Sequence, residues 1–300
     1  MSLAGPAGQG FMTDVTVLTE GLAMGESARW HDGRFWCSDW MAGEVLTISV
    51  NGADAGQCEV VTRSTSFPFC FDWTSDNTML VTSRSGLDRL DADGSLHAHS
   101  DLSSLSDYGW NEVAVHPSGA AYVNGINFDM MGADGMNFEL GSTSGLIAVV
   151  TPDGACRIVA DTVGFPNGMA ISPDGSTLLV AESFASRVAA FDIDDDHGLG
   201  NRRVWAELDG GADGISLDAE GALWCATQVG AVRIAAGGTV LQRVELDRPA
   251  FSVALGGPTG TTLFMVANEW KGVEQIGKGP RTGIVYMTEV DVPAVTLSAS

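Results

Sequence analysis

Turn signals recur along the chain at intervals typical of repeat proteins, and this repeat limits the fold more than any other feature. Six turns lie at residues 31–34, 74–77, 116–120, 172–176, 218–222 and 257–261. Their last turn residues are Gly33, Asn77, Gly119, Gly175, Gly221 and Gly260, which are 44, 42, 56, 46 and 39 residues apart. A short apolar run precedes each turn and an apolar, β-rich run follows it.

A second series of turns alternates with the first. These turns are NGADAG, DADG, PDG, DDDHG and AAGG, at residues 51–56, 91–94, 152–154, 194–198 and 235–238. Two hairpin turns per repeat imply four antiparallel strands, and repeats of about 40–50 residues with four strands are propeller blades. The sequence therefore predicts an all-β, six-bladed β-propeller, whereas a β-sandwich predicts no regular doubled pattern of turns.

The ring is expected to close through the N-terminal part of the chain. The last repeat has little chain left for a fourth strand, and the strand-like segment 14–21 precedes the first repeat. We therefore predict that residues 14–21 form the outer strand of the last blade, which removes an open sheet edge. A single domain would then span residues 14–290, with tails at 1–13 and 291–300. Residues 125–143 are predicted to be an insertion in the third blade that lies over one face.

Composition excludes several classes of partner. The chain has 15 Lys and Arg against 38 Asp and Glu, a formal net charge of −23, so nucleic acid and anionic membranes are poor partners. It has no apolar run of the roughly 20 residues that a membrane span needs, and no signal-peptide pattern. Its five cysteines lack CxxC spacing, which favours reduced thiols in the cytoplasm. The oligomeric state is left open.

The repeat also places oxygen-bearing side chains in one register. Counting back from the last turn residue, by seven residues in the first repeat and eight in the others, gives Glu26, Phe69, Asn111, Asn167, Asp213 and Ser252. Inner strands of a propeller run in the same sense along the channel, so equivalent positions lie at one height. Glu26, Asn111, Asn167 and Asp213 are therefore expected to converge. Ligands of this kind suit Ca²⁺, Mg²⁺ or Mn²⁺, whereas Zn²⁺ usually takes His or Cys as well.

Each of these residues also has an ordinary structural explanation when taken alone. Asn167 and Asp213 precede glycines, as residues in turns often do, and Glu26 can be a solvated loop residue. The shared register favours a common site. No GxSxG elbow, phosphate loop or GxGxxG fingerprint occurs, which disfavours serine hydrolases of that type and nucleotide-binding enzymes.

Four segments resemble one known family. GESARW (25–30), WNEVAVHPSG (110–119), GFPNGMAISPDGSTLLVAES (164–183) and DGISLDAEGALWCA (213–226) are similar to the senescence-marker-protein/gluconolactonase/luciferin-regenerating-enzyme family. The resemblance spans roughly residues 20 to 280 and implies a six-bladed propeller with one divalent metal ion in its channel. It implies that Glu26, Asn167 and Asp213 are the metal ligands, that Asp213 is the general base, and that Asn111 holds metal or substrate. Ca²⁺ is the expected cation, with Mg²⁺, Mn²⁺ or Zn²⁺ as alternatives.

The chain departs from the family pattern at two positions. Gly109 stands where sugar lactonases of the family often carry Arg, and Glu112 stands where Asp is common. The aromatic residues expected around the substrate are Trp110, Phe69, Phe128 and Trp270, with Phe67 and Phe165 nearby. Without the Arg, a lactone or ester less polar than a sugar lactone is the expected substrate.

The predicted function is a divalent-metal-dependent hydrolase that opens a lactone. The metal ion would polarise the carbonyl, Asp213 would activate water, and Asn111 would orient the substrate. One alternative is an organophosphate or aryl-ester hydrolase that uses the same metal site. An alternative from another class is a non-catalytic propeller that binds calcium or another ligand.

Overall fold

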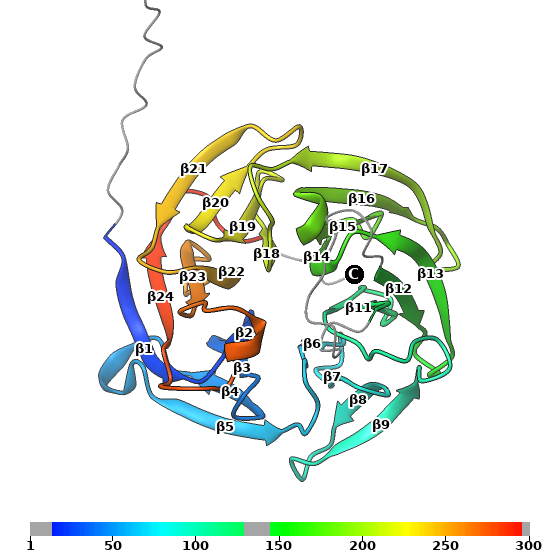
Figure 1. The fold of residues 1–300 in the computed structure, drawn as a ribbon, viewed down its shortest axis with the longest axis horizontal. Helices are drawn as coiled ribbons and strands as arrows, with labels where there is room; N and C mark the ends of the chain where they lie inside the picture. The colour runs from blue at the N-terminus through cyan, green and yellow to red at the C-terminus, as the bar shows by residue number, and fades with distance from the viewer. Residues whose placement is uncertain (1–13, 129–144, 296–300) are drawn as a thin grey trace, which may run out of the picture.

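The computed structural model describes residues 14–128 and 145–295, which form six four-stranded antiparallel sheets in a ring around a central axis (Figure 1). The predicted six-bladed β-propeller is confirmed. Within these ranges the only helices are three 3₁₀ turns, η1 (Gly52–Asp54), η2 (Ser183–Ala185) and η3 (Val273–Gln275). None of them has the length and hydropathy needed to cross a membrane.

In blades one to five the strands follow the chain order from the channel to the rim (Figure 1). Blade one consists of β2 (Gly25–His31), β3 (Arg34–Asp39), β4 (Glu44–Ile48) and β5 (Cys58–Arg63). Blade two consists of β6 (Phe71–Trp73), β7 (Met79–Ser83), β8 (Gly86–Leu90) and β9 (Leu96–Asp101). Blade three consists of β10 (Val113–Val115), β11 (Ala121–Ile126), β12 (Gly145–Val150) and β13 (Cys156–Val163). Blade four consists of β14 (Pro166–Ile171), β15 (Thr177–Glu182), β16 (Arg187–Ile193) and β17 (Leu199–Glu207). Blade five consists of β18 (Ile215–Leu217), β19 (Leu223–Thr227), β20 (Gly230–Ile234) and β21 (Val240–Glu245).

Blade six is built from both ends of the described chain. Its strands from the channel outward are β22 (Ala250–Gly256), β23 (Thr262–Ala267), β24 (Gly283–Glu289) and β1 (Thr16–Leu22). β1 pairs antiparallel with β24, so the predicted closing strand is confirmed. Leu18 and Leu22 of β1 are buried in the apolar cluster that joins blades six and one.

Three segments lie outside the described residues: 1–13, 129–144 and 296–300. Most of the predicted insertion at 125–143 and the whole predicted N-terminal tail fall there. Residues 291–295 lie against blades five and six, since Pro293 O accepts a hydrogen bond from Ala219 N at 2.9 Å and Ala294 N donates to Gly260 O at 2.8 Å.

Apolar clusters fill the spaces between neighbouring blades. One cluster joins blades three and four and contains Tyr122, Ile147, Leu178 and Phe191. Another joins blades four and five through Val188, Leu223 and Ile234 among others. This packing leaves the ends of the inner strands free to line the channel.

Candidate active site in the central channel

The four oxygen-bearing residues singled out by the repeat line one cavity of about 370 Å³ in the channel. Glu26 lies in β2 and Asn167 in β14, whereas Asn111 and Asp213 each precede the inner strand of their blade by two residues. All four sit at the same end of the inner strands. The structure therefore brings together the whole predicted constellation.

In blade one, irregular pairing near the start of the inner strand turns Glu26 inward. The pairing of β2 with β3 shifts between Glu26 and Arg29, and Ser27 has a φ of 52°. In a regular strand, residues three apart face opposite sides of the sheet. Because the bulge inserts an extra residue, both Glu26 and Arg29 face the channel.

The glycines that follow Asn167 and Asp213 are needed for close packing between blades. A Cβ atom on Gly168 would lie 2.6 Å from Asp213 O, and one on Gly214 would lie 2.7 Å from Ser252 Oγ. Neither glycine is among those with a positive φ. The Asn-Gly and Asp-Gly pairs are therefore not turn residues here, which removes the structural alternative that their sequence suggested.

The two carboxylates at the bottom of the cavity are strongly disfavoured in their charged forms. Burial raises the pKa of Asp213, and the charge of Glu112 raises it further. Burial, Asp213 and Glu112 together raise the pKa of Glu26. The Oδ1 atom of Asp213 is buried and has no hydrogen-bond partner among the described residues. Buried carboxylates are stable in their charged form when a cation compensates them, so this pair fits a bound cation.

The remaining contacts orient the candidate ligands. Glu26 Oε2 accepts a hydrogen bond from Ser27 N at 2.8 Å. Asn167 Nδ2 donates to Ser183 Oγ at 3.4 Å, and its hydrogen bond to Asp213 lowers the pKa of that residue against the larger effects above. In the described chain, no group of three or more His, Cys, Asp or Glu side chains could hold a metal ion. Two carboxylates and two amides are instead the oxygen donors that Ca²⁺, Mg²⁺ or Mn²⁺ prefers.

A partly buried ion pair crosses the channel beneath these residues. Arg29 NH2 donates to Glu112 Oε2 at 2.9 Å and to Val113 O at 3.2 Å, which joins blade one to blade three. Arg29 and Asp72 also line a second cavity of about 250 Å³ at the opposite end of the channel. The charge of Arg29 offsets that of Glu112, the residue at which the chain departs from the family's usual Asp.

Eight aromatic side chains line the cavity wall. They are Trp40, Phe67, Tyr108, Trp110, Phe165, Phe184, Phe251 and Trp270. Trp110 and Trp270 were predicted substrate contacts, and both lie in the wall. Phe128, also predicted, has its ring centroid 6.1 Å from that of Phe165. A substrate that reaches the carboxylates therefore passes a largely apolar surface.

Phe69 does not lie where the sequence places it. Its side chain is fully buried with Val45, Phe71 and Met79 in the core between blades one and two. Its neighbours Phe67 and Pro68 line the cavity instead. Phe69 keeps the predicted backbone position, but burial in the core stabilises its apolar ring more than the channel would, so the prediction that it contacts substrate is corrected.

Sequence reasoning missed several wall residues that follow the second strand of a blade. Trp40 comes directly after β3, Phe184 two residues after β15, and Gln228 directly after β19. The main cavity lies at the end of the channel where the first strand of each blade starts and the second strand ends. Polar or aromatic residues just past the second strand are thus the signal that could have identified them.

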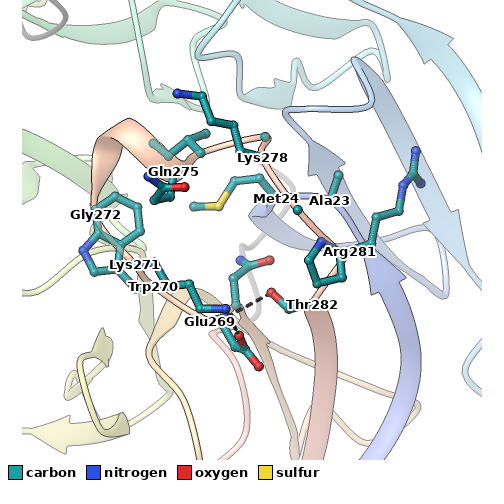
Figure 2. Close-up of a pocket in the computed structure, with 15 residues that line it drawn as sticks. Ala23, Met24, Glu269, Trp270, Lys271, Gly272, Gln275, Lys278, Arg281 and Thr282 are labelled. Carbon is teal, nitrogen blue, oxygen red and sulfur yellow. Dashed lines mark hydrogen bonds and ion pairs between the residues drawn. The ribbon is translucent and has the colours of Figure 1, made fainter.

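The loop between β23 and β24 borders the cavity. The strand-like sequence continues to Trp270, but β23 ends at Ala267, and the loop encloses a side pocket of about 70 Å³ (Figure 2). Met24, Trp270 and Ile276 line both this pocket and the main cavity. The loop carries the only two lysines of the chain, Lys271 and Lys278. Lys271 pairs with Glu269 at 2.8 Å, and Lys278 extends away from Arg281 (Figure 2).

Comparison with known proteins points to a single family. Residues 24–269 match the SMP-30/Gluconolactonase/LRE-like region. The chain is 27% identical over 241 residues to a 6-deoxy-6-sulfogluconolactonase from Pseudomonas putida, covering 75% of this chain and 77% of that protein. It is similar in structure to regucalcin, a calcium-binding protein from Agrobacterium tumefaciens, with a TM-score of 0.76, 25% identity, and coverage of 97% and 98%. A luciferin-regenerating enzyme has a TM-score of 0.77, 18% identity, and coverage of 95% and 98%, which shows a shared fold.

Proposed function

We propose a function from one premise: the chain belongs to the SMP-30/Gluconolactonase/LRE-like family. On that premise we infer that the protein hydrolyses a lactone with the help of one divalent cation held by Glu26, Asn167 and Asp213. The observation that carries the proposal is the buried pair Glu26 and Asp213 in one cavity, with Oδ1 of Asp213 unpartnered among the described residues. Ca²⁺ is the proposed cation, and the structural likeness to a calcium-binding protein supports it.

The residues of the cavity have distinct roles in this proposal. A divalent cation supplies a positive charge that polarises a carbonyl oxygen and favours the ionised form of Asp213. Asp213 accepts a proton from the attacking water, whose oxygen forms a bond to the acyl carbon of the lactone. The bond between the acyl carbon and the ring oxygen then breaks, and the proton passes from Asp213 to the released alkoxide, giving a hydroxy acid. Asn111 orients the lactone through its side-chain amide.

The cavity wall supports a substrate less polar than an aldonolactone. Gly109 has a φ of 83°, a backbone conformation that side chains rarely adopt. An Arg at this position would be strained, and the charge-assisted hydrogen bonds that Arg makes to hydroxyl groups are missing. The aromatic side chains of the wall favour apolar surface instead.

We expect the aryl-fused lactone dihydrocoumarin to have a kcat/KM about tenfold or more above that of gluconolactone. Burial of about 60 Å² of additional apolar surface at about 25 cal/mol per Å² stabilises the bound state by about 1.5 kcal/mol, or about tenfold. The measurement is kcat/KM for gluconolactone, γ-valerolactone and dihydrocoumarin under one set of conditions. Trp270→Ala should reduce the preference for dihydrocoumarin, since Trp270 lines the wall. A clear preference for gluconolactone contradicts the polarity argument.

The proposed function is tested by removing the cation and restoring it. Protein treated with a chelator should lose lactone hydrolysis, and addition of Ca²⁺ or Mn²⁺ should restore it. If the metal-loaded protein is inert to every lactone but cleaves phosphotriesters or aryl esters, the alternative hydrolase activity replaces the proposal. If it binds the cation and hydrolyses none of these compounds, it is a non-catalytic binding propeller.

A further inference from the structure

Side chains of one blade hold the backbone of the next blade at the candidate ligands Asn111 and Asn167. Thr82 Oγ1, in blade two, donates to Asn111 O at 2.7 Å. Asn124 Nδ2, in blade three, donates to Asn167 O at 2.7 Å. The amide oxygen of Asn124 also accepts a hydrogen bond from Glu112 N at 3.2 Å. Asn124 is fully buried, so these bonds form without competition from water.

The same arrangement occurs one residue before each candidate carboxylate. Ser183 Oγ, in blade four, donates to Ala212 O at 2.7 Å, next to Asp213. Asn268 Nδ2, in blade six, donates to Gly25 O at 3.2 Å, next to Glu26. In all four cases the donor lies near the end of the second strand of a blade and the acceptor lies on the following blade.

The same type of bond also occurs at a blade that supplies no candidate ligand. Trp40 Nε1, just after β3, donates to Phe69 O at 2.6 Å. The bond is therefore a general feature by which this propeller joins its blades near the channel. At four of these junctions the accepting carbonyl belongs to a candidate ligand or to the residue before it. The hydrogen bond there also helps to position an oxygen donor of the site.

Ser183 has the most direct contact with the candidate ligands. Its hydroxyl donates to the carbonyl beside Asp213 and accepts a hydrogen bond from Asn167 Nδ2 at 3.4 Å. The nitrogen and oxygen of an amide lie on opposite sides of its carbon, so this contact turns Asn167 Oδ1 away from Ser183. One hydroxyl thus fixes the orientation of one candidate ligand and the backbone of a second.

We propose that Thr82, Asn124, Ser183 and Asn268 are positioning residues that set the geometry of the cation ligands and of the substrate-orienting Asn111 across four blade junctions, with Ser183 orienting the amide of Asn167. The inference rests on the proposed function, since it takes Glu26, Asn111, Asn167 and Asp213 as the residues around the cation. Mutation of a residue that hydrogen-bonds to a metal ligand and orients it typically weakens metal affinity about 10–100-fold. The chain also contains similar hydrogen bonds between blades far from the cavity, and their loss shows the effect of weakening a blade junction alone.

Two control residues make the same kind of hydroxyl-to-carbonyl hydrogen bond between blades, but outside the cavity. Ser100 Oγ donates to Gly154 O at 2.8 Å, from blade two to blade three. Thr62 Oγ1 donates to Gly94 O at 2.9 Å, from blade one to blade two. Both are buried, and neither lines the cavity. Ser183→Ala is therefore matched by Ser100→Ala, and Thr82→Val by Thr62→Val.

The test measures the Kd for Ca²⁺ and for Mn²⁺ by titration calorimetry of the metal-free full chain, together with Tm. Ser183→Ala should raise Kd about tenfold or more, whereas Ser183→Thr, which keeps the hydroxyl, should restore it. Thr82→Val, which acts through the substrate-orienting Asn111, should raise KM for dihydrocoumarin, and Thr82→Ser should restore that KM. Ser100→Ala and Thr62→Val should lower Tm and leave Kd unchanged. Wild-type cation affinity in folded Ser183→Ala, together with wild-type KM in folded Thr82→Val, overturns the inference alone, whereas a wild-type chain that binds neither cation overturns the proposed function and the inference together.

Discussion

Replacement of Asp213 by Asn is expected to lower kcat/KM for lactone hydrolysis by about 10³-fold or more, because it removes a proposed cation ligand and the proposed general base together. The same variant should lose stoichiometric binding of the divalent cation. Both effects are measured on purified protein, by initial rates with dihydrocoumarin and by metal analysis after dialysis.

Asp72 provides the matched control for that substitution. Asp72 lines the cavity at the opposite end of the channel and accepts a hydrogen bond from Val115 N at 2.8 Å. Asp72→Asn makes the same chemical change in the same channel and should retain cation binding and most of the activity. Equal losses of cation binding and activity in the two variants would show that both properties depend on carboxylates anywhere in the channel. That result would contradict the specific role of Asp213.

Deletion of residues 1–22 is expected to lower the free energy of unfolding by at least about 5 kcal/mol, which equals the whole stability of a domain at the lower end of the usual range of about 5–15 kcal/mol. The deletion removes β1, the outer strand of blade six, and exposes the edge of β24. It also removes Leu18 and Leu22 from the cluster between blades six and one, and each buried leucine contributes about 1.5–3 kcal/mol. Urea denaturation followed by circular dichroism measures the change.

Deletion of residues 1–13 is the control, because it leaves β1 intact. That variant should unfold at the same urea concentration as the full chain. A chain without residues 1–22 that unfolds with the same midpoint as the full chain would contradict the stabilising role of the closing strand.

The fold could be predicted because each repeat requires a particular backbone conformation at its turns, and only a few residue types adopt that conformation readily. The last residue of every turn in the first series has a positive φ, from 64° at Asn77 to 89° at Gly119, and this conformation favours Gly and Asn. Those residues therefore recur at fixed places in each repeat. The register of Glu26, Asn111, Asn167 and Asp213 follows from them, which is why the sequence alone predicted the residues that meet in the channel.

The rest of the site depends on contacts between residues that do not occupy equivalent positions in the repeats, so the repeat pattern does not reveal them. Arg29 and Glu112 are 83 residues apart and meet only because the ring lets blade one reach blade three past blade two, across the channel. Ser183 bonds to Ala212 across a blade junction. Phe69 shares the register of the ligands, yet its ring packs in the core, since the repeat fixes backbone position and not side-chain direction. The cytoplasmic location and the terminal tails stay predictions.

The most direct test of the central claim is the position of a bound cation in crystals of the full chain grown with Mn²⁺, located by its anomalous scattering. One peak is expected in the channel cavity, with oxygen atoms of Glu26, Asn167 and Asp213 within about 2.0–2.6 Å of it. A map with no peak in that cavity, or with a peak that contacts neither Glu26 nor Asp213, would contradict the assignment of these residues as the cation site.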